Sequence, residues 1–337
     1  MSGVDYAPHR RSRRGRLFGA LARTWERFVV VAFRTASALL VRVPLRISEP
    51  IARMGFLAGY YLWPAKRRII KTNAAHVLGL PRDHRDVARL ARGIYGTYSR
   101  FAIEVMRLPN LPADEPLRLV ELSGPQHERF IALWQRCEAE GRGIIAVSGH
   151  IGSIEVFAGA YALQGMPTYG LADDSAFPEL FELLNRSRAR WGVTIIPWKK
   201  LRDVFRVMRK PAILGMIVDW GYRSDDLPVQ MFDAWTSLPA GPATLAARTG
   251  AALVPVLAKR RADGRYDPIM YEPIEVADSS PAEIARATQA IAAALEDMVA
   301  EAPEQWYTFK PMWPATDAEA AELARRASET SKGAADA

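Results

Sequence analysis

A histidine and a glutamate five residues apart are the side chains best placed for acid–base chemistry. His150 follows the apolar run GIIAVSG at 143–149, and Glu155 ends the stretch His-Ile-Gly-Ser-Ile-Glu. On a straight helix they would lie about 140° apart, so they meet only if His150 lies in a turn and Glu155 in the first helical turns. Gly149 and Gly152 permit such a turn and leave room for a substrate. The spacing predicts a catalytic imidazole–carboxylate pair.

Motifs for other catalytic chemistries are missing. The sequence has no Gly-x-Ser-x-Gly around Ser148, no Gly-Lys-Ser/Thr phosphate loop, no Gly-x-Gly-x-x-Gly and no His-Glu-x-x-His. Its five histidines have no metal-binding spacing, and its one cysteine, Cys137, excludes an internal disulfide and a cysteine-based zinc site. We therefore expect chemistry without a metal or other cofactor.

Short apolar runs that alternate with amphipathic segments predict the fold that positions these residues. Strands alternating with helices indicate an α/β fold, with a largely parallel central sheet flanked by helices. Functional groups in such sheets gather at the carboxyl edge of the strands, where His150 lies. The expected strands span 143–149, 167–173, 193–197, 212–219, 229–232, 252–259 and 267–276.

The N-terminal part is strongly basic and helical. The first 80 residues carry 15 Lys and Arg against three acidic residues, a net charge of +12, although the whole chain is only +8. The basic residues alternate with apolar stretches, which favours an anionic membrane surface over nucleic acid as the partner. Arg34 interrupts the best apolar window, so we expect this segment to lie on the membrane without crossing it. An ordinary basic helical subdomain is the alternative.

These patterns divide the chain into four parts. We expect a disordered basic tail at 1–16 and a helical membrane-docking segment at 17–110. An α/β catalytic core at 111–314 and a polar C-terminal tail at 315–337, either unstructured or a frayed helix, follow. The helices expected in the docking segment span 17–43, 48–63, 66–78 and 84–107.

Five stretches of the chain resemble the lysophospholipid acyltransferase superfamily. The hexapeptide from His150 to Glu155 is similar to its His-x4-Asp/Glu signature. The chain resembles most the bacterial branch of late lipid A acyltransferases and phosphatidylinositol mannoside acyltransferases. The supporting stretches, in the family's order, are RRIIKTNAAHVLGLP at 67–81, IVDWGY at 217–222, LPAGPATLAARTGAALVPV at 238–256 and PEQWYTFKPMW at 303–313.

The resemblance implies transfer of a fatty acyl group from acyl-CoA or acyl-carrier protein to a hydroxyl of a membrane lipid or glycolipid. It implies that His150 is the general base, and that Glu155 orients the imidazole and stabilises its charged form. Asp219 ends the strand expected at 212–219, and a supporting acid or acceptor-binding role is implied for it.

Three further residues are candidates for substrate binding. Asp173 and Asp174 end another expected strand, and Arg223 could meet a phosphate of the acceptor or of the carrier's phosphopantetheine. The alternatives are a helix cap for each aspartate, Asp219 included, and a solvated loop charge for the arginine.

The implied location is peripheral, on the cytoplasmic face of the bacterial inner membrane. Pro239-Ala240-Gly241-Pro242 lacks the Glu and Arg of the corresponding motif in glycerol-phosphate acyltransferases, which argues against glycerol phosphate as acceptor. Two other functions remain open. One is a catalytically inactive lipid-binding protein of the same fold, and the other is a thioester hydrolase.

Overall fold

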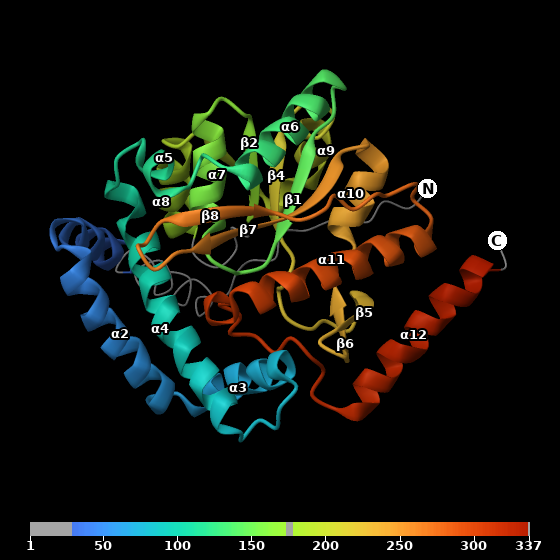
Figure 1. Cartoon of the computed structure of the whole chain (residues 1–337), viewed down its shortest axis with the longest axis horizontal. Helices are drawn as coiled ribbons and strands as arrows, with labels where there is room; N and C mark the ends of the chain where they lie inside the picture. The colour runs from blue at the N-terminus through green and yellow to red at the C-terminus, as the bar shows by residue number, and fades with distance from the viewer. Residues whose placement is uncertain (1–28, 173–177, 336–337) are drawn as a thin grey trace, which may run out of the picture.

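A six-stranded sheet lies at the centre of the computed structural model, which describes residues 29–172 and 178–335 (Figure 1). The strand order is β3–β2–β4–β1–β7–β8; the first five strands are parallel, and β8 is antiparallel to β7. The predicted α/β fold with a largely parallel sheet is thus confirmed. The strands are β1 (Ile144–Ser148), β2 (Thr168–Ala172), β3 (Val193–Pro197), β4 (Ile213–Ile217), β7 (Ala252–Arg260) and β8 (Tyr266–Met270).

Helices cover both faces of the sheet. The central strand β1 shows why both faces need cover: Ile144 and Ala146 pack with α6 and α7, whereas Ile145 and Val147 pack with α9, α10 and α11. All five residues of β1 are buried, as in a strand enclosed on two sides. The helices of the core are α5 (Glu115–Leu119), α6 (Pro125–Ala139), α7 (Ile154–Leu163), α8 (Pro178–Ala189), α9 (Leu201–Val207), α10 (Gly241–Thr249) and α11 (Pro281–Glu301).

Three helices pack beside the sheet around a core of their own. They are α2 (Leu45–Leu62), α3 (Pro64–Leu78) and α4 (Arg85–Arg107), and α2 lies along α4 on the outside of the molecule (Figure 1). Residues 29–42 are also helical, whereas the rest of the helix expected at 17–43 and the tail expected at 1–16 lie outside the described residues. None of the helices in the described ranges has the length and apolar composition that a bilayer crossing requires.

A β-hairpin follows the sheet strand β4. It consists of β5 (Leu227–Met231) and β6 (Ala234–Leu238), which pair antiparallel. The apolar pattern predicts a strand at 229–232 but none at β6. The turn between the two strands has positive φ at Phe232 and Asp233. Hairpin turns of this kind are usually marked by glycine or asparagine, so the sequence carried little sign of the second strand.

The last helix, α12 (Asp317–Ala335), forms from the stretch for which a polar tail and a frayed helix were the two expectations. It packs against the hairpin and α11. Leu323 is buried, and the Arg326 guanidinium donates hydrogen bonds to the carbonyl oxygens of Ser224 and Asp226. A single buried leucine and an arginine are a weak apolar pattern, which is why the sequence left a tail and a frayed helix as alternatives.

Candidate active site

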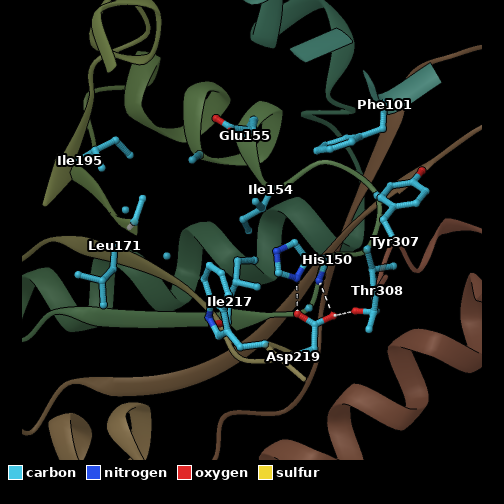
Figure 2. A pocket seen from close by; sticks show the side chains of 18 of the residues that line it. Phe101, His150, Ile154, Glu155, Leu171, Ile195, Ile217, Asp219, Tyr307 and Thr308 are labelled. Carbon is cyan, nitrogen blue, oxygen red and sulfur yellow. Dashed lines mark hydrogen bonds and ion pairs between the residues drawn. The ribbon is translucent and has the colours of Figure 1, made fainter. Parts of the chain in front are cut away.

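The register of two adjacent strands brings His150 and Asp219 together. Ser148, the last residue of β1, is paired with Ile217, the last residue of β4. His150 and Asp219 each lie two residues beyond these ends. The His150 Nδ1 is 2.6 Å from Asp219 Oδ1, and the His150 backbone N–H donates to Oδ2 at 2.8 Å (Figure 2). A histidine–aspartate pair therefore lies at the carboxyl edge of the central sheet, where the sequence predicted the site.

Asp219 is held by two further donors from one segment near the C-terminus. Trp306 Nε1 and Thr308 Oγ1 donate to Asp219 Oδ2 at 2.8 and 2.9 Å. The Asp219 side chain is fully buried. Burial alone would raise its pKa, but the charge of His150 and the hydrogen bonds from His150 and Trp306 lower it below the usual range. Asp219 is thus kept as a carboxylate.

The imidazole of His150 lies between this carboxylate and an open cavity. Burial would lower the pKa of His150, but the charge and hydrogen bond of Asp219 outweigh burial and raise it. Because Nδ1 donates to Asp219, the neutral ring carries its free electron pair on Nε2. The side chain is still 39% exposed, and Figure 2 shows the ring nitrogen opposite Asp219 turned toward the cavity. This is the arrangement of a general base.

Asn73 on α3 fixes the segment that supports Asp219. Its Nδ2 donates to the carbonyl oxygens of Thr308 and Lys310, and its Oδ1 accepts from the Met312 backbone N–H. The Tyr307 N–H donates to the carbonyl of His150 at 2.7 Å. Two stretches singled out in the sequence, at 67–81 and 303–313, thereby meet around the histidine.

Glu155 is placed differently from the expectation. It lies in the first turn of α7 and forms a two-pronged ion pair with Arg188 of α8, at 2.8 and 2.5 Å. Figure 2 shows its carboxylate pointing away from His150. Burial would raise the pKa of Glu155, but the charge and hydrogen bonds of Arg188 lower it. The carboxylate on the imidazole is that of Asp219, and Glu155 instead connects two helices beside the cavity.

The Glu155–Arg188 pair should stabilise the fold. Both side chains are nearly buried, so removing one partner leaves an unpaired buried charge. We expect Glu155→Ala to lower the free energy of unfolding by about 3 kcal/mol, with Arg188→Ala similar. The double variant should lose less than the sum, which urea unfolding of all four proteins measures. Additive losses would show that the two side chains act independently. Arg186→Ala, on the exposed face of α8, is the control.

Gly149 and Gly152, on either side of His150, allow close packing of the turn that contains the histidine. An added Cβ at Gly152, where φ is +60°, would lie 1.8 Å from the carbonyl oxygen of Ala258. An added Cβ at Gly149 would lie 3.0 Å from Asp219 Oδ2. The space at Gly152 thus admits the backbone of strand β7, and the space at Gly149 admits the carboxylate of Asp219; both glycines also line the cavity beside His150.

A cavity of about 500 Å³ opens beside His150. Its inner walls are mostly apolar and come from β2, β3 and β4, with Leu171, Ile195 and Ile217 among the lining side chains (Figure 2). Its other end is lined by Phe101 and Tyr307. The volume and the apolar lining of this cavity suit an alkyl chain. The His150–Asp219 pair would lie beside such a chain.

The remaining candidates contribute less. Asp173 and Asp174 lie outside the described residues. Arg223 is exposed, pairs with Asp225 at 3.4 Å and does not line the cavity. Cys137 is buried on α6. Within the described ranges, no three His, Cys, Asp or Glu side chains gather as potential metal ligands.

Comparisons with known proteins agree with this geometry. Residues 19–314 match the model of the family described as bacterial lipid A biosynthesis acyltransferase. A phosphatidylinositol mannoside acyltransferase of Mycolicibacterium smegmatis is 27% identical over 72% of this chain and 78% of its own length. One from Mycobacterium tuberculosis is 25% identical, over 72% and 76%. The lipid A biosynthesis lauroyltransferase of Escherichia coli is 27% identical over 56% and 60%. The resemblance seen in the sequence is confirmed, and the chain belongs to the bacterial lipid A biosynthesis acyltransferase family.

Proposed function

We propose that this acyltransferase moves a fatty acyl group from an acyl thioester, acyl-CoA or acyl-carrier protein, to a hydroxyl of a membrane lipid or glycolipid, with His150 as general base. The observation that carries the proposal is the buried His150–Asp219 pair at the side of an apolar cavity. The names of the mycobacterial and Escherichia coli relatives support a glycolipid as the class of acceptor.

The chemistry follows from the tautomer of His150. Nε2 removes the proton of the acceptor hydroxyl as its oxygen attacks the thioester carbonyl. Asp219 stabilises the imidazolium that forms, as a carboxylate does in a catalytic triad. The tetrahedral intermediate then breaks its C–S bond, and the thiolate takes the proton back from Nε2. The products are an ester and a free thiol, and His150 returns to its neutral form.

Glu155 and Asp219 enter this proposal in different roles. Asp219 acts directly on the imidazole. Glu155 stabilises the wall of the cavity through its ion pair with Arg188, since both residues line the cavity. Arg223, Asp173 and Asp174 are left as candidates for contacts with the polar part of a substrate.

Product analysis with the purified full chain tests the proposal. Labelled acyl-CoA and acyl-carrier protein are each incubated with vesicles that contain a bacterial glycolipid extract, and the products are identified by mass spectrometry. We expect acyl ester on a lipid, in an amount that rises with acceptor concentration. Free fatty acid as the sole product at every acceptor concentration would instead assign a thioester hydrolase. No turnover of either donor would favour the inactive lipid-binding protein.

We further propose that α2 holds the enzyme on the cytoplasmic face of the inner membrane. Four large apolar side chains on one side of this helix, Ile47, Ile51, Met54 and Leu62, are exposed, and Leu62 is 83% exposed. We call these four residues the α2 apolar face. Nearby exposed arginines, Arg46 among them, suit anionic headgroups.

Replacing three residues of the α2 apolar face should weaken membrane binding. The triple variant Ile51→Ser, Met54→Ser, Leu62→Ser should bind phosphatidylglycerol vesicles roughly 100-fold less tightly, because each apolar side chain loses about 1 kcal/mol or more of burial. Added salt should weaken binding of both proteins by screening the arginines. Vesicle sedimentation measures both effects. Leu117→Ser, on α5, is the control; equal binding by all three proteins would contradict the assignment.

A further inference from the structure

A second cavity lies between α2, α3 and α4. It has a volume of about 560 Å³ and an aromatic lining that includes Phe56, Trp63, Tyr95 and Phe309. The size falls within the range of ligand pockets, about 300–1,000 Å³. Nothing in the proposed reaction so far uses this space, although it is as large as the cavity beside His150.

One side of α2 forms the open wall of this second cavity. Ala52, Gly55 and Gly59 of α2 and Trp63, the residue after its end, line the cavity, and they follow one another at spacings of three and four residues. A Cβ added at Gly55 or Gly59 would meet no atom within 4 Å. Glycine within a helix costs stability relative to alanine. The two glycines therefore keep the cavity open at positions where larger side chains would be free to enter it.

The second cavity borders the α2 apolar face. Gly55 is exposed and lies one helical turn from Ile51, and Gly59 lies one turn from Leu62. A hydrocarbon chain in contact with the exposed face would thus reach the cavity without crossing a polar surface.

The second cavity also meets the catalytic cavity. Lys66, Tyr98 and Phe309 line both of them. Lys66 Nζ donates to the carbonyl oxygen of Phe309 at 3.2 Å, so its ammonium is held at the junction. A molecule with an apolar chain in the second cavity would place its polar end near this ammonium, on the side that leads to His150.

We propose that the second cavity binds one fatty acyl chain of the acceptor lipid, which enters sideways from the membrane past Gly55 and Gly59. This inference rests on the proposed function. The donor's acyl chain occupies the apolar cavity beside His150, and the acceptor's chain occupies the second cavity. Their polar ends meet between the two, where the acceptor hydroxyl approaches the base. The occupant is a membrane lipid because the second cavity borders the α2 apolar face, which the proposed function places on the membrane.

Photocrosslinking tests the site without requiring turnover. The full chain is bound to phosphatidylcholine–phosphatidylglycerol vesicles that contain phosphatidylglycerol with a diazirine at the end of one acyl chain. We expect adducts on Tyr95 or Phe309, which lie behind α2. Gly59→Leu fills the cavity with a side chain, and it should reduce these adducts roughly tenfold by excluding a few methylene groups.

A matched variant separates the cavity from the membrane surface. Ala58→Leu places the same leucine side chain on the exposed side of α2, and it should keep the adducts on Tyr95 and Phe309. Circular dichroism checks that both variants fold. Adducts confined to the α2 apolar face, or equal on Tyr95 and Phe309 in both variants, would overturn the inference.

Kinetics then link the site to the reaction. Gly59→Leu should raise the KM for the lipid acceptor roughly tenfold and leave the KM for the acyl donor unchanged. An unchanged acceptor KM would overturn the acceptor assignment. If the unmodified chain gives the adducts on Tyr95 and Phe309 but transfers no acyl group, the proposed function fails and the lipid site stands. If it transfers acyl groups without these adducts, only the lipid site fails.

Discussion

His150→Ala should reduce acyl transfer by roughly 10²–10⁴-fold, which is the usual contribution of a positioned general base. The loss should appear in kcat, because the proton is transferred in the reaction step and not on binding. The fold should survive, since Oδ2 of the buried Asp219 carboxylate keeps its three hydrogen bonds, from the backbone of residue 150 and from Trp306 and Thr308. Steady-state transfer of a labelled acyl group, with circular dichroism as a check of folding, measures the effect.

The control is another histidine outside both cavities. His127 on α6 lies 3.3 Å from the hydroxyl of Tyr161 and lines neither cavity. His127→Ala should transfer acyl groups at close to the rate of the unmodified protein. If His150→Ala did the same, His150 would not be the base, and the hydroxyl would have to lose its proton to another group.

The histidine could be predicted because its signals are local. An apolar strand, two glycines and the start of a helix lie within a dozen residues, and they place His150 at the edge of the sheet whatever the strand order. The class of fold was predictable for the same reason, since alternating strands and helices leave a pattern in each segment. The second hairpin strand at Ala234–Leu238 was missed because its turn has no glycine and begins with Phe232, a bulky residue that is rare at positive φ.

The partner of the histidine could not be predicted from the same signals. Sequence spacing favoured Glu155, but the choice depends on which strand lies beside β1. The pairing of Ser148 with Ile217 brings in Asp219 from 69 residues away. The order of the strands is set by the packing of the whole sheet, so it cannot be predicted from the local pattern of one sequence. Arg188, the partner of Glu155, comes from a different helix for the same reason.

The residues that hold Asp219 in place could be seen in the sequence only as parts of stretches that resemble the family. Asn73 lies in one of the stretches that resemble the family, and Trp306 and Thr308 lie in another. Nothing in their types or spacing shows that Asn73 binds the segment that binds Asp219. A buried asparagine whose amide makes three hydrogen bonds to backbone is visible only in three dimensions.

Asp219→Asn should be about as damaging as loss of the histidine itself, with a loss of roughly 10²–10⁴-fold. Oδ2 of Asp219 accepts three hydrogen bonds, from the His150 backbone and from Trp306 and Thr308, whereas Oδ1 accepts one, from His150 Nδ1. An asparagine keeps most of these bonds by leaving its oxygen at the Oδ2 position. Its amide nitrogen then faces Nδ1 as a donor.

This change would reverse the tautomer of the imidazole. Nδ1 would have to accept a hydrogen bond, so the proton of the neutral ring would move to Nε2, the atom that should take the proton of the acceptor. The shape of the site would be kept while the base is lost. The loss should again lie in kcat, with the KM for the acceptor nearly unchanged. A rise in the acceptor KM at constant kcat would instead support the acceptor-binding role that the sequence suggested for Asp219.

The same variant has a pH signature. In the unmodified protein Asp219 raises the pKa of His150 above its ordinary 6.5, against the opposing effect of burial. Transfer should therefore increase with pH through a value above 6.5, as the imidazolium loses its proton. In Asp219→Asn the carboxylate's charge is gone, so the residual transfer should rise at lower pH. A rate profile with the same midpoint in both proteins would contradict the coupling of the two side chains.

Stability should depend on pH in the same way. The raised pKa of His150 contributes stability that is fully present below pH 6.5 and is lost as the pH rises through its folded pKa. The lowered pKa of Asp219 contributes stability that is present above 3.8 and is lost in acid. Urea unfolding should therefore show the largest stability difference between the unmodified protein and Asp219→Asn at about pH 5, and a smaller one at about pH 9. A difference that does not change between these two conditions would mean that the buried carboxylate is stabilised by its hydrogen bonds from the His150 backbone, Trp306 and Thr308, and not by a charged histidine.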